Sequence, residues 1–170
     1  MKRWLALAIV WLTFLTGCRG APPSAVDAPV TDGFTCEADI TYKDTRLAGT
    51  LSRAGAGTLK LAFSAPDTLK GITVEWQGDA VTASLYGLSF SLSEQALPAG
   101  ALGRVLIDAL DAASRSSDGV RITGAALTWT GAGQNGAVTL TADPADGRLL
   151  SLEMPGVPLK ATFSGFHTTS

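Results

Sequence analysis

The chain has 170 residues, with 15 acidic and 13 basic side chains, one histidine and two cysteines. This length suits a single domain, because a second domain would normally need another ~100 residues. The net charge of −2 and the lack of a basic cluster argue against nucleic-acid binding. Hydrophobic residues make up 46% of the chain and charged residues 16%, which excludes a disordered protein. The 19 glycines predict a small all-β domain with many turns.

The N-terminus has the layout of an export signal. Lys2 and Arg3 precede a nearly continuous apolar run, Trp4–Leu15. Its 12 residues would span ~18 Å as a helix, which is too short for a bilayer core of ~30 Å. The run therefore predicts a cleaved signal peptide, residues 1–17, and not a permanent membrane span.

The apolar run ends in Leu15-Thr16-Gly17-Cys18, which resembles the bacterial lipobox. The resemblance implies cleavage before Cys18 and transfer of a diacylglyceryl group to its sulfur. Acyl chains contribute ~0.8 kcal/mol per buried methylene group, and more than one chain gives stable anchoring. We therefore expect a lipid-anchored protein in the bacterial cell envelope, on the extracytoplasmic side of the membrane. The alternative is an ordinary export signal that ends in a cysteine.

A flexible tether, residues 18–33, is expected to link this anchor to one domain, residues 34–170. The stretch Arg19–Gly33 holds three prolines, three alanines and two glycines without apolar periodicity, which is typical of a linker. Cys36 is then the only cysteine of the folded domain, so an internal disulfide is impossible. Because Cys36 alternates with apolar residues, we expect a small core side chain, and a reactive thiol is the alternative.

From residue 34 onward, apolar residues recur mainly at every second position, the pattern of half-buried strands. The clearest runs are Leu47, Gly49 and Leu51; Leu59, Leu61 and Phe63; Ile72, Val74 and Trp76; Val81, Ala83 and Leu85; and Leu88, Phe90 and Leu92. Glycine-rich turn signals between the runs favour an antiparallel meander. Further strands are expected at about 120–130, 137–142, 148–154 and 157–166. The total is about nine or ten strands.

One segment, Pro98–Ala113, breaks this period and predicts a helix. Its apolar residues form a stripe with a spacing of about 3.6 residues: Leu102, Val105, Leu106, Ala109, Leu110 and Ala113. Pro98 suits a first helical position, and Asp118-Gly119 suits the exit. Gly100 and Gly103 each cost up to ~1 kcal/mol inside a helix, so we expect close packing to compensate.

A sheet of this many strands cannot stay flat, because its twist makes it curl. The helix is expected to pack its stripe in the concave face of the sheet. The predicted fold is therefore mostly β: a curved antiparallel half-barrel with one amphipathic α-helix in the hollow.

The lipobox, tether, strands and helix together resemble the lipoprotein-carrier half-barrel fold of the LolA/LolB family. Ser64–Ile72, Tyr86-Gly87-Leu88 and Leu97-Pro98 also look like segments of small uncharacterised lipoproteins of Gram-positive bacteria. The resemblance covers the mature domain as architecture. It implies contact with a lipid or another apolar ligand, and no catalytic residue. The chain differs from LolA in its expected lipid anchor and in having one clear helix.

Several patterns that suggest chemistry have simpler interpretations. Gly131–Gly136 matches the dinucleotide motif G-x-G-x-x-G, but the following residues alternate like a strand, so a hairpin is favoured. His167 lies near the C-terminus, where a frayed end would not orient a catalytic base. One histidine also makes a histidine-based zinc site impossible. We expect no enzyme activity, no metal and no cofactor.

Two carboxylate pairs likewise have a simpler interpretation than catalysis. Glu37 and Asp39 on a strand, and Asp108 and Asp111 on the helix, are expected on solvated faces. In the predicted strand 120–130, Trp129 shares one face with Leu127, and Ile122 takes the opposite face. One of these faces should be partly exposed unless the strand is covered on both sides.

Two functions follow from this reading, and both describe a monomer. In the first, the concave face binds an acyl chain or another apolar ligand through Leu59, Leu61, Phe63, Ile72, Val74 and Trp76. The helix then acts as a plug or lid through Leu102, Val105, Leu106 and Leu110. In the second, the helix fills the hollow completely, and the protein is a structural or protein-interaction lipoprotein. Free volume between helix and sheet would favour the first.

Overall fold

The computed structural model describes residue 30 and residues 33–96, 101–123 and 125–168. The predicted signal peptide, the lipobox and Cys18 lie outside these residues. So do nearly all of the predicted tether and the predicted helix start at Pro98 and Gly100. Val30, at the end of the predicted tether, is only 4% exposed and belongs to the hydrophobic core.

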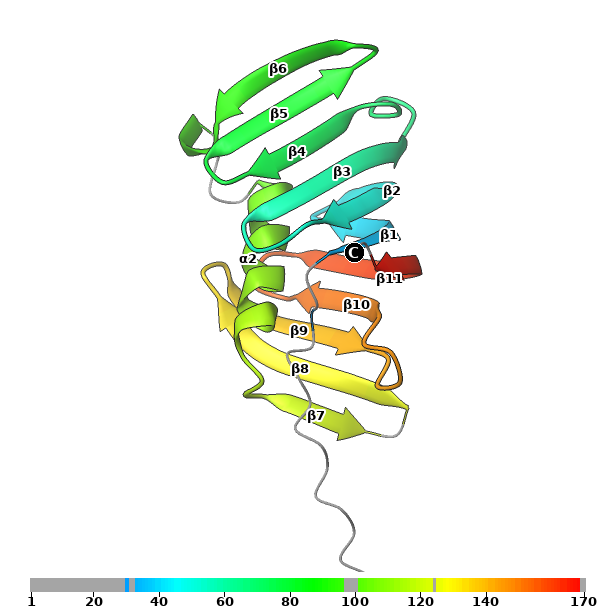
Figure 1. The fold of residues 1–170 in the computed structure, drawn as a ribbon, viewed down its shortest axis with the longest axis vertical. Coiled ribbons are helices and arrows are strands. Elements are labelled where there is room, and N and C mark those ends of the chain that lie inside the picture. Colours follow the sequence, from blue (N-terminus) through cyan, green and yellow to red (C-terminus); the bar gives the residue numbers. More distant parts are fainter. Residues whose placement is uncertain (1–29, 31–32, 97–100, 124, 169–170) are drawn as a thin grey trace, which may run out of the picture.

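The described residues form one antiparallel sheet of eleven strands in the order β6-β5-β4-β3-β2-β1-β11-β10-β9-β8-β7 (Figure 1). The edge strands β6 and β7 do not pair with each other, so the curved sheet stays open. The strands are β1 Phe34–Tyr42, β2 Thr45–Arg53, β3 Thr58–Ala65, β4 Thr73–Gln77, β5 Ala80–Leu85, β6 Leu88–Ser93, β7 Val120–Thr123, β8 Ala126–Gly133, β9 Gly136–Ala142, β10 Leu149–Met154 and β11 Leu159–Thr168.

The chain builds the sheet as two meanders that meet at its centre. Strands β1 to β6 run outward to one edge and β7 to β11 run inward from the other, so β1 pairs with β11. After β6 come a short 3-10 helix, η2 (Glu94–Ala96), and the helix α2 (Leu102–Arg115), which leads to β7. Helix α2 therefore crosses the sheet on its way from one edge to the other (Figure 1).

Curvature lets this one helix reach distant strands. Helix α2 contacts both β3 and β8, which lie six strand positions apart in the sheet. In a flat sheet that separation would be about 29 Å, whereas the 14 residues of α2 span about 21 Å. The curvature of the sheet shortens the distance between β3 and β8 across its concave face. The predicted architecture, a mostly β half-barrel with one helix against its concave face, is confirmed.

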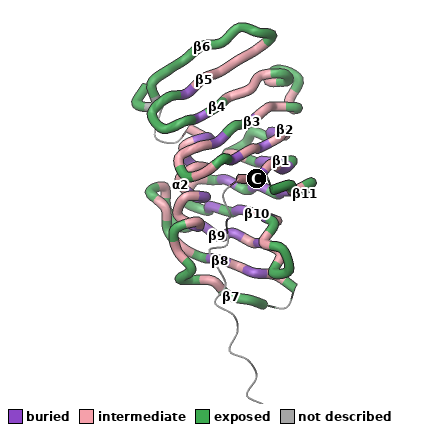
Figure 2. The backbone as a smooth tube through the Cα atoms, in the orientation of Figure 1, coloured by how far each residue is buried: buried purple, intermediate pink, exposed green. Residues whose placement is uncertain are grey.

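The predicted apolar stripe of α2 is confirmed as the buried side of the helix. The buried residues are Gly103, Val105, Leu106, Ala109, Leu110 and Ala113. They join the strands in one hydrophobic core, and burial is densest from β3 to β9 (Figure 2). The helix ends at Arg115, two residues later than the sequence pattern predicts.

The prediction of one strand over residues 120–130 is wrong, because this segment is a hairpin of β7 and β8. Residue 124 is outside the described residues, and the chain reverses between Thr123 and Ala126. The reversal places Ile122 opposite Leu127, so both side chains share the face of Trp129. Counting along an unbroken strand assigns Ile122 to the wrong face.

The solvated face expected for Asp108 and Asp111 is also wrong, because both carboxylates bind the sheet. Asp111 accepts a hydrogen bond from Arg53 at 2.7 Å and from the backbone N–H of Gly57 at 3.1 Å. Asp108 accepts one from the backbone N–H of Asn135 at 3.1 Å. The helix is thus fixed to the β2–β3 and β8–β9 turns by its polar side, while its apolar stripe packs below.

Candidate functional site

The concave face can be followed across the sheet through the pairing register, because cross-strand partners lie on the same face. Leu61 on β3 is fully buried in the core and pairs with Val74 on β4. Val74 pairs with Ala83 on β5, which pairs with Phe90 on β6. Along this row the exposed fraction rises from 0% at Leu61 to 66% at Phe90. The apolar face therefore extends beyond the part that α2 covers.

Under α2, the predicted ligand residues are core residues. Leu59, Leu61 and Trp76 are at most 6% exposed. The predicted plug residues of the helix pack on the same cluster: Val105, Leu106 and Leu110 are fully buried, and Leu102 is partly buried. The helix here fills the hollow as part of the core. This is the arrangement expected for a structural or protein-interaction lipoprotein.

Beyond the N-terminal end of α2, the described helices leave the same face of β4 to β6 open. Phe63, Ile72 and Val74, the other three predicted ligand residues, are half-buried at the border of this region. We call the open region the wing face, and it consists of Ile72, Val74, Ala83, Leu85, Leu88, Phe90 and Leu92. Figure 2 shows β5 and β6 mostly in the colours of intermediate and exposed residues.

The most exposed residues of the wing face were not among the predicted ligand residues. Leu88, Phe90 and Leu92 on β6 are 67%, 66% and 52% exposed. Their alternation with serines predicts a two-faced strand, but it does not predict that this strand forms an edge beyond the reach of the helix. The opposite face is polar: Thr82 and Ser91 share a hydrogen bond there at 3.2 Å.

Two buried indole groups add a polar feature to the concave face. Trp76 on β4 and Trp129 on β8 are 6% and 2% exposed, and neither indole N–H has an acceptor among the described residues. A buried donor without a partner costs about 1–3 kcal/mol. The ring of Trp76 lies against Gly103 in the first turn of α2, where a Cβ atom would meet ring carbons at 2.1 Å. Trp76 thus marks the border between the helix and the wing face.

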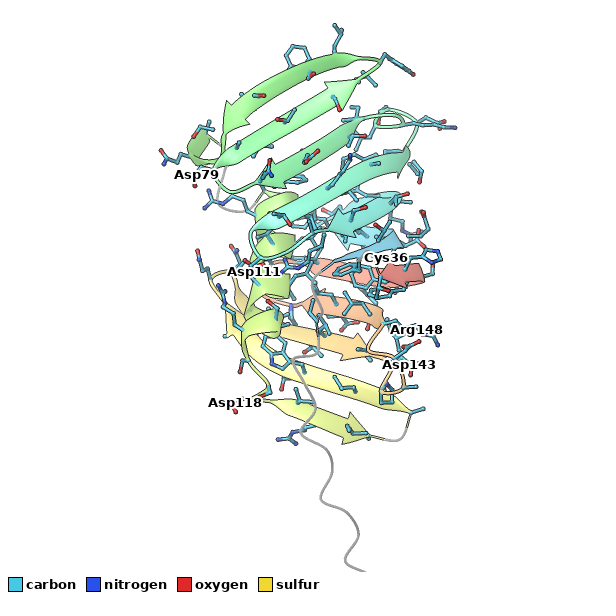
Figure 3. All side chains as sticks on the ribbon, in the orientation of Figure 1. Cys36, Asp79, Asp111, Asp118, Asp143 and Arg148 are labelled. Atoms are coloured by element: carbon cyan, nitrogen blue, oxygen red, sulfur yellow. The ribbon has the colours of Figure 1, made fainter. Side chains whose placement is uncertain are left out.

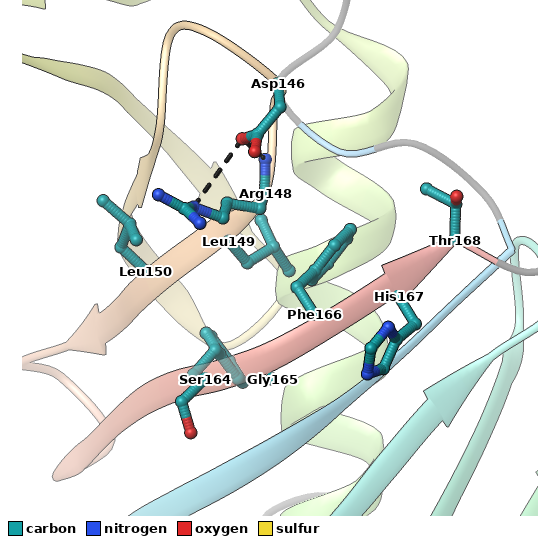
Figure 4. Close-up of a pocket in the computed structure, with 10 residues that line it drawn as sticks. Asp146, Arg148, Leu149, Leu150, Ser164, Gly165, Phe166, His167 and Thr168 are labelled. Atoms are coloured by element: carbon teal, nitrogen blue, oxygen red, sulfur yellow. Dashed lines mark hydrogen bonds and ion pairs between the residues drawn. The ribbon is translucent and has the colours of Figure 1, made fainter.

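A separate hollow of about 550 Å³ opens where β10 and β11 diverge (Figure 4). Their pairing ends at Ser151 and Thr162, and β11 continues along β1. The hollow is lined by Asp146, Arg148, Leu149, Leu150, Phe163, Ser164, Gly165, Phe166, His167 and Thr168.

The charged side chains beside this hollow hold the turn between β9 and β10 through ion pairs. Arg148 contacts Asp143 at 2.7 Å and Asp146 at 3.7 Å. The pKa of Asp143 lies below its usual value, because the backbone N–H of Ala145 and then the Arg148 side chain donate hydrogen bonds to the carboxylate. The frayed end expected at His167 is wrong, since His167 is paired in β11. Within the described residues, His167 forms no hydrogen bond to Asp146, so a histidine–carboxylate pair is not assembled.

Two further hollows lie outside the concave face. One, of about 250 Å³, lies on the polar side of α2 and includes Arg104, Asp108 and Asp111, and another, of about 400 Å³, includes Lys43, Glu153 and Lys160. The described residues contain no group of three or more histidine, cysteine or acidic side chains placed to hold a metal ion. None of the described helices has the length and hydropathy to span a membrane.

Cys36 behaves as a core residue. It is 1% exposed, and burial, followed by the nearby charge of Glu37, raises the pKa of its thiol to about 12. The thiolate is the reactive form of cysteine, so this thiol is protonated and shielded at neutral pH. Glu37 itself points to solvent, as predicted, and its carboxylate accepts a hydrogen bond from Thr50 at 2.9 Å.

Known structures share this architecture. An uncharacterised conserved protein from Thermus thermophilus matches with a TM-score of 0.51 and 15% identity, over 86% of this chain and 84% of that chain. A LolA superfamily protein from Nitrosomonas europaea matches with a TM-score of 0.43 and 11% identity, over 82% and 87%. The chain has a curved half-barrel fold with one helix, and it shares this fold with the Thermus thermophilus protein.

A third similar structure is the complex of the CwlD amidase with the GerS lipoprotein from Clostridioides difficile. It matches with a TM-score of 0.47 and 14% identity, over 94% of both chains. No protein-family model and no curated protein matches the sequence. At these identities the likeness concerns the fold alone.

Proposed function

We propose that the protein is a lipid-anchored binding protein of the bacterial cell envelope, and that its wing face holds an acyl chain or another apolar ligand. The observation that carries the proposal is the exposure of Leu88, Phe90 and Leu92 on one face of the sheet. Large contiguous apolar patches are rare on soluble monomers and mark binding surfaces. The driving force would be burial of apolar surface, without covalent chemistry.

The shape of the open face supports a ligand that lies beside the helix. The buried stripe of α2 occupies the hollow over Leu59 and Leu61, while the wing face continues the same apolar surface outward. An acyl chain would lie along Phe90, Ala83 and Val74 toward the end of the helix.

The alternative is a protein-interaction lipoprotein whose wing face binds another protein. The complete burial of Val105, Leu106 and Leu110 favours it, because the helix-covered hollow is already filled. An experiment that identifies what touches Phe90 in the cell separates the two functions.

Photo-crosslinking from β6 tests the nature of the occupant. The photoreactive residue p-benzoylphenylalanine is introduced into the full chain at Phe90 or, as the matched control, at Ser91. Successive strand residues point to opposite faces, so we expect about ten times more lipid adduct at position 90 than at position 91. Mass spectrometry of the irradiated, purified protein measures the adducts. Equal yields at both positions, or an adduct with an unrelated protein at position 90, would contradict an apolar ligand.

The lipid anchor is tested by replacing the lipobox cysteine. In bacteria fed labelled palmitate, the full chain should carry the label and sediment with membranes, whereas Cys18→Ser should lose both properties. Two or more acyl chains hold a protein stably on a bilayer, so the change should move most of the protein out of the membrane fraction. Cys36→Ser is the matched control and should keep the label. Label that persists in Cys18→Ser would refute the assignment.

A further inference from the structure

The two edges of the open sheet differ in how they are protected. Exposed edge strands present unpaired backbone groups, and proteins usually shield them by shortness, charge, proline or a bulge. Strand β7 is short, with four residues, and carries the exposed Arg121. Strand β6 has six residues in regular register with β5, and the strand itself contains no charged residue. Of the two edges, β6 is the one left available for pairing with a further strand.

The sequence of β6 reads the same in both directions around Phe90: Leu88-Ser89-Phe90-Ser91-Leu92. In an antiparallel pair of two identical strands centred on Phe90, Leu88 would lie opposite the partner's Leu92 and Ser89 opposite the partner's Ser91. Apolar side chains then meet apolar ones on the concave face, and serines meet serines on the other face.

The direction of the backbone groups fits this register. The two-residue turn Tyr86-Gly87 has positive φ angles of 49° and 83° and closes the hairpin on the pair Leu85–Leu88. Hydrogen-bonded pairs alternate along an antiparallel ladder, so the backbone groups of Ser89 and Ser91 face the open edge. In the centred register these two residues become the hydrogen-bonded pairs between copies. Phe90 falls at a non-hydrogen-bonded position, where facing side chains lie closest.

We propose that the protein forms a two-fold dimer in which β6 pairs with β6 of a second copy. The pairing joins the two wing faces into one continuous apolar trough, to which each copy contributes Leu88, Phe90 and Leu92. This deepens the proposed function, because the ligand surface is complete only in the dimer, and it replaces the monomer expected from the sequence. The assembly stops at two copies, since a two-fold contact uses the same edge of both subunits and leaves the shielded β7 edges outside.

Disulfide trapping tests the register in the full chain in membranes. Non-hydrogen-bonded partners have Cα atoms about 4.5 Å apart, within the range that a disulfide bridges. Phe90→Cys should therefore form a crosslinked dimer on mild oxidation. Leu88→Cys alone should not, because the two copies of position 88 lie four residues out of register, but co-expressed Leu88→Cys and Leu92→Cys should. Equal crosslinking of all three, or none, would overturn the proposal.

A proline variant separates this inference from the proposed function. Ser91→Pro removes a backbone N–H that faces the open edge, so the β5–β6 ladder is retained. In a Phe90→Cys background it should reduce the crosslinked dimer about tenfold, whereas Ser84→Ala on the adjacent strand should leave it unchanged. Lipid adducts that persist at position 90 in Ser91→Pro would show ligand binding without the dimer. A dimer without lipid adducts would retain the pairing and refute the ligand.

Discussion

Replacing Asp111 with alanine is expected to lower the free energy of unfolding by about 3 kcal/mol. The Asp111 carboxylate contacts the guanidinium of Arg53, whose side chain is fully buried, at 2.7 Å. It also accepts hydrogen bonds from the backbone N–H of Gly57. Removing the carboxylate leaves a buried positive charge without this counter-charge, which costs more than the contact itself contributes. Urea unfolding of the full chain, followed by tryptophan fluorescence, measures the change.

The matched control is Asp118→Ala. Asp118 is exposed in the loop between α2 and β7, whereas Asp111 lies on the helix itself (Figure 3). Substitution of an exposed residue of this kind normally changes stability by less than about 0.5 kcal/mol. If Asp111→Ala cost no more than Asp118→Ala, the pair with Arg53 would not hold the helix on the sheet.

Gly103→Ala is expected to lower the free energy of unfolding by about 2 kcal/mol, through overpacking against Trp76. Alanine favours a helix over glycine by about 1 kcal/mol, so propensity alone predicts the opposite sign. The sign is reversed because the new Cβ atom would lie 2.1 Å from ring carbons of Trp76, which is buried. Either the helix or the ring must move. The same urea titration measures the loss.

Two comparisons make this second prediction specific. Gly55→Ala adds a Cβ atom with nothing within 4 Å and should change stability little. Combining Gly103→Ala with Trp76→Leu should cost less than the two changes separately, since the smaller side chain removes the clash, and contacting residues couple by about 0.5–3 kcal/mol. Strictly additive losses would show that the helix does not rest on Trp76.

Periodicity predicts those parts of the fold that are local. The alternation of Leu88, Phe90 and Leu92 with serines marks a strand, and the stripe from Leu102 to Ala113 marks a helix with one apolar side. Both patterns report burial within one element, which is a local property of the sequence. The hairpin favoured at Gly131–Gly136 also forms: Gln134 and Asn135 connect β8 to β9, and Gly136, the first residue of β9, has a positive φ of 112° that glycine adopts readily.

The features that define the site are not local. The spacing of Asp111 on α2 carries no signal that Arg53 lies opposite, since the contact joins residues 58 positions apart. The same limit applies to Ile122, whose face depends on a chain reversal. Whether Phe90 is covered depends on strand order and on how far the helix extends, and alternation determines neither. For this reason the predicted ligand residues divide between core and wing face.

The pairing of β1 with β11 has a consequence for how the chain acquires its structure. Each meander consists of neighbouring hairpins that can form early, but the centre of the sheet joins the first and last strands of the domain. Closing such a large loop is entropically costly, and proteins dominated by distant contacts fold slowly. The domain therefore cannot complete its core before the final strand has emerged from the ribosome.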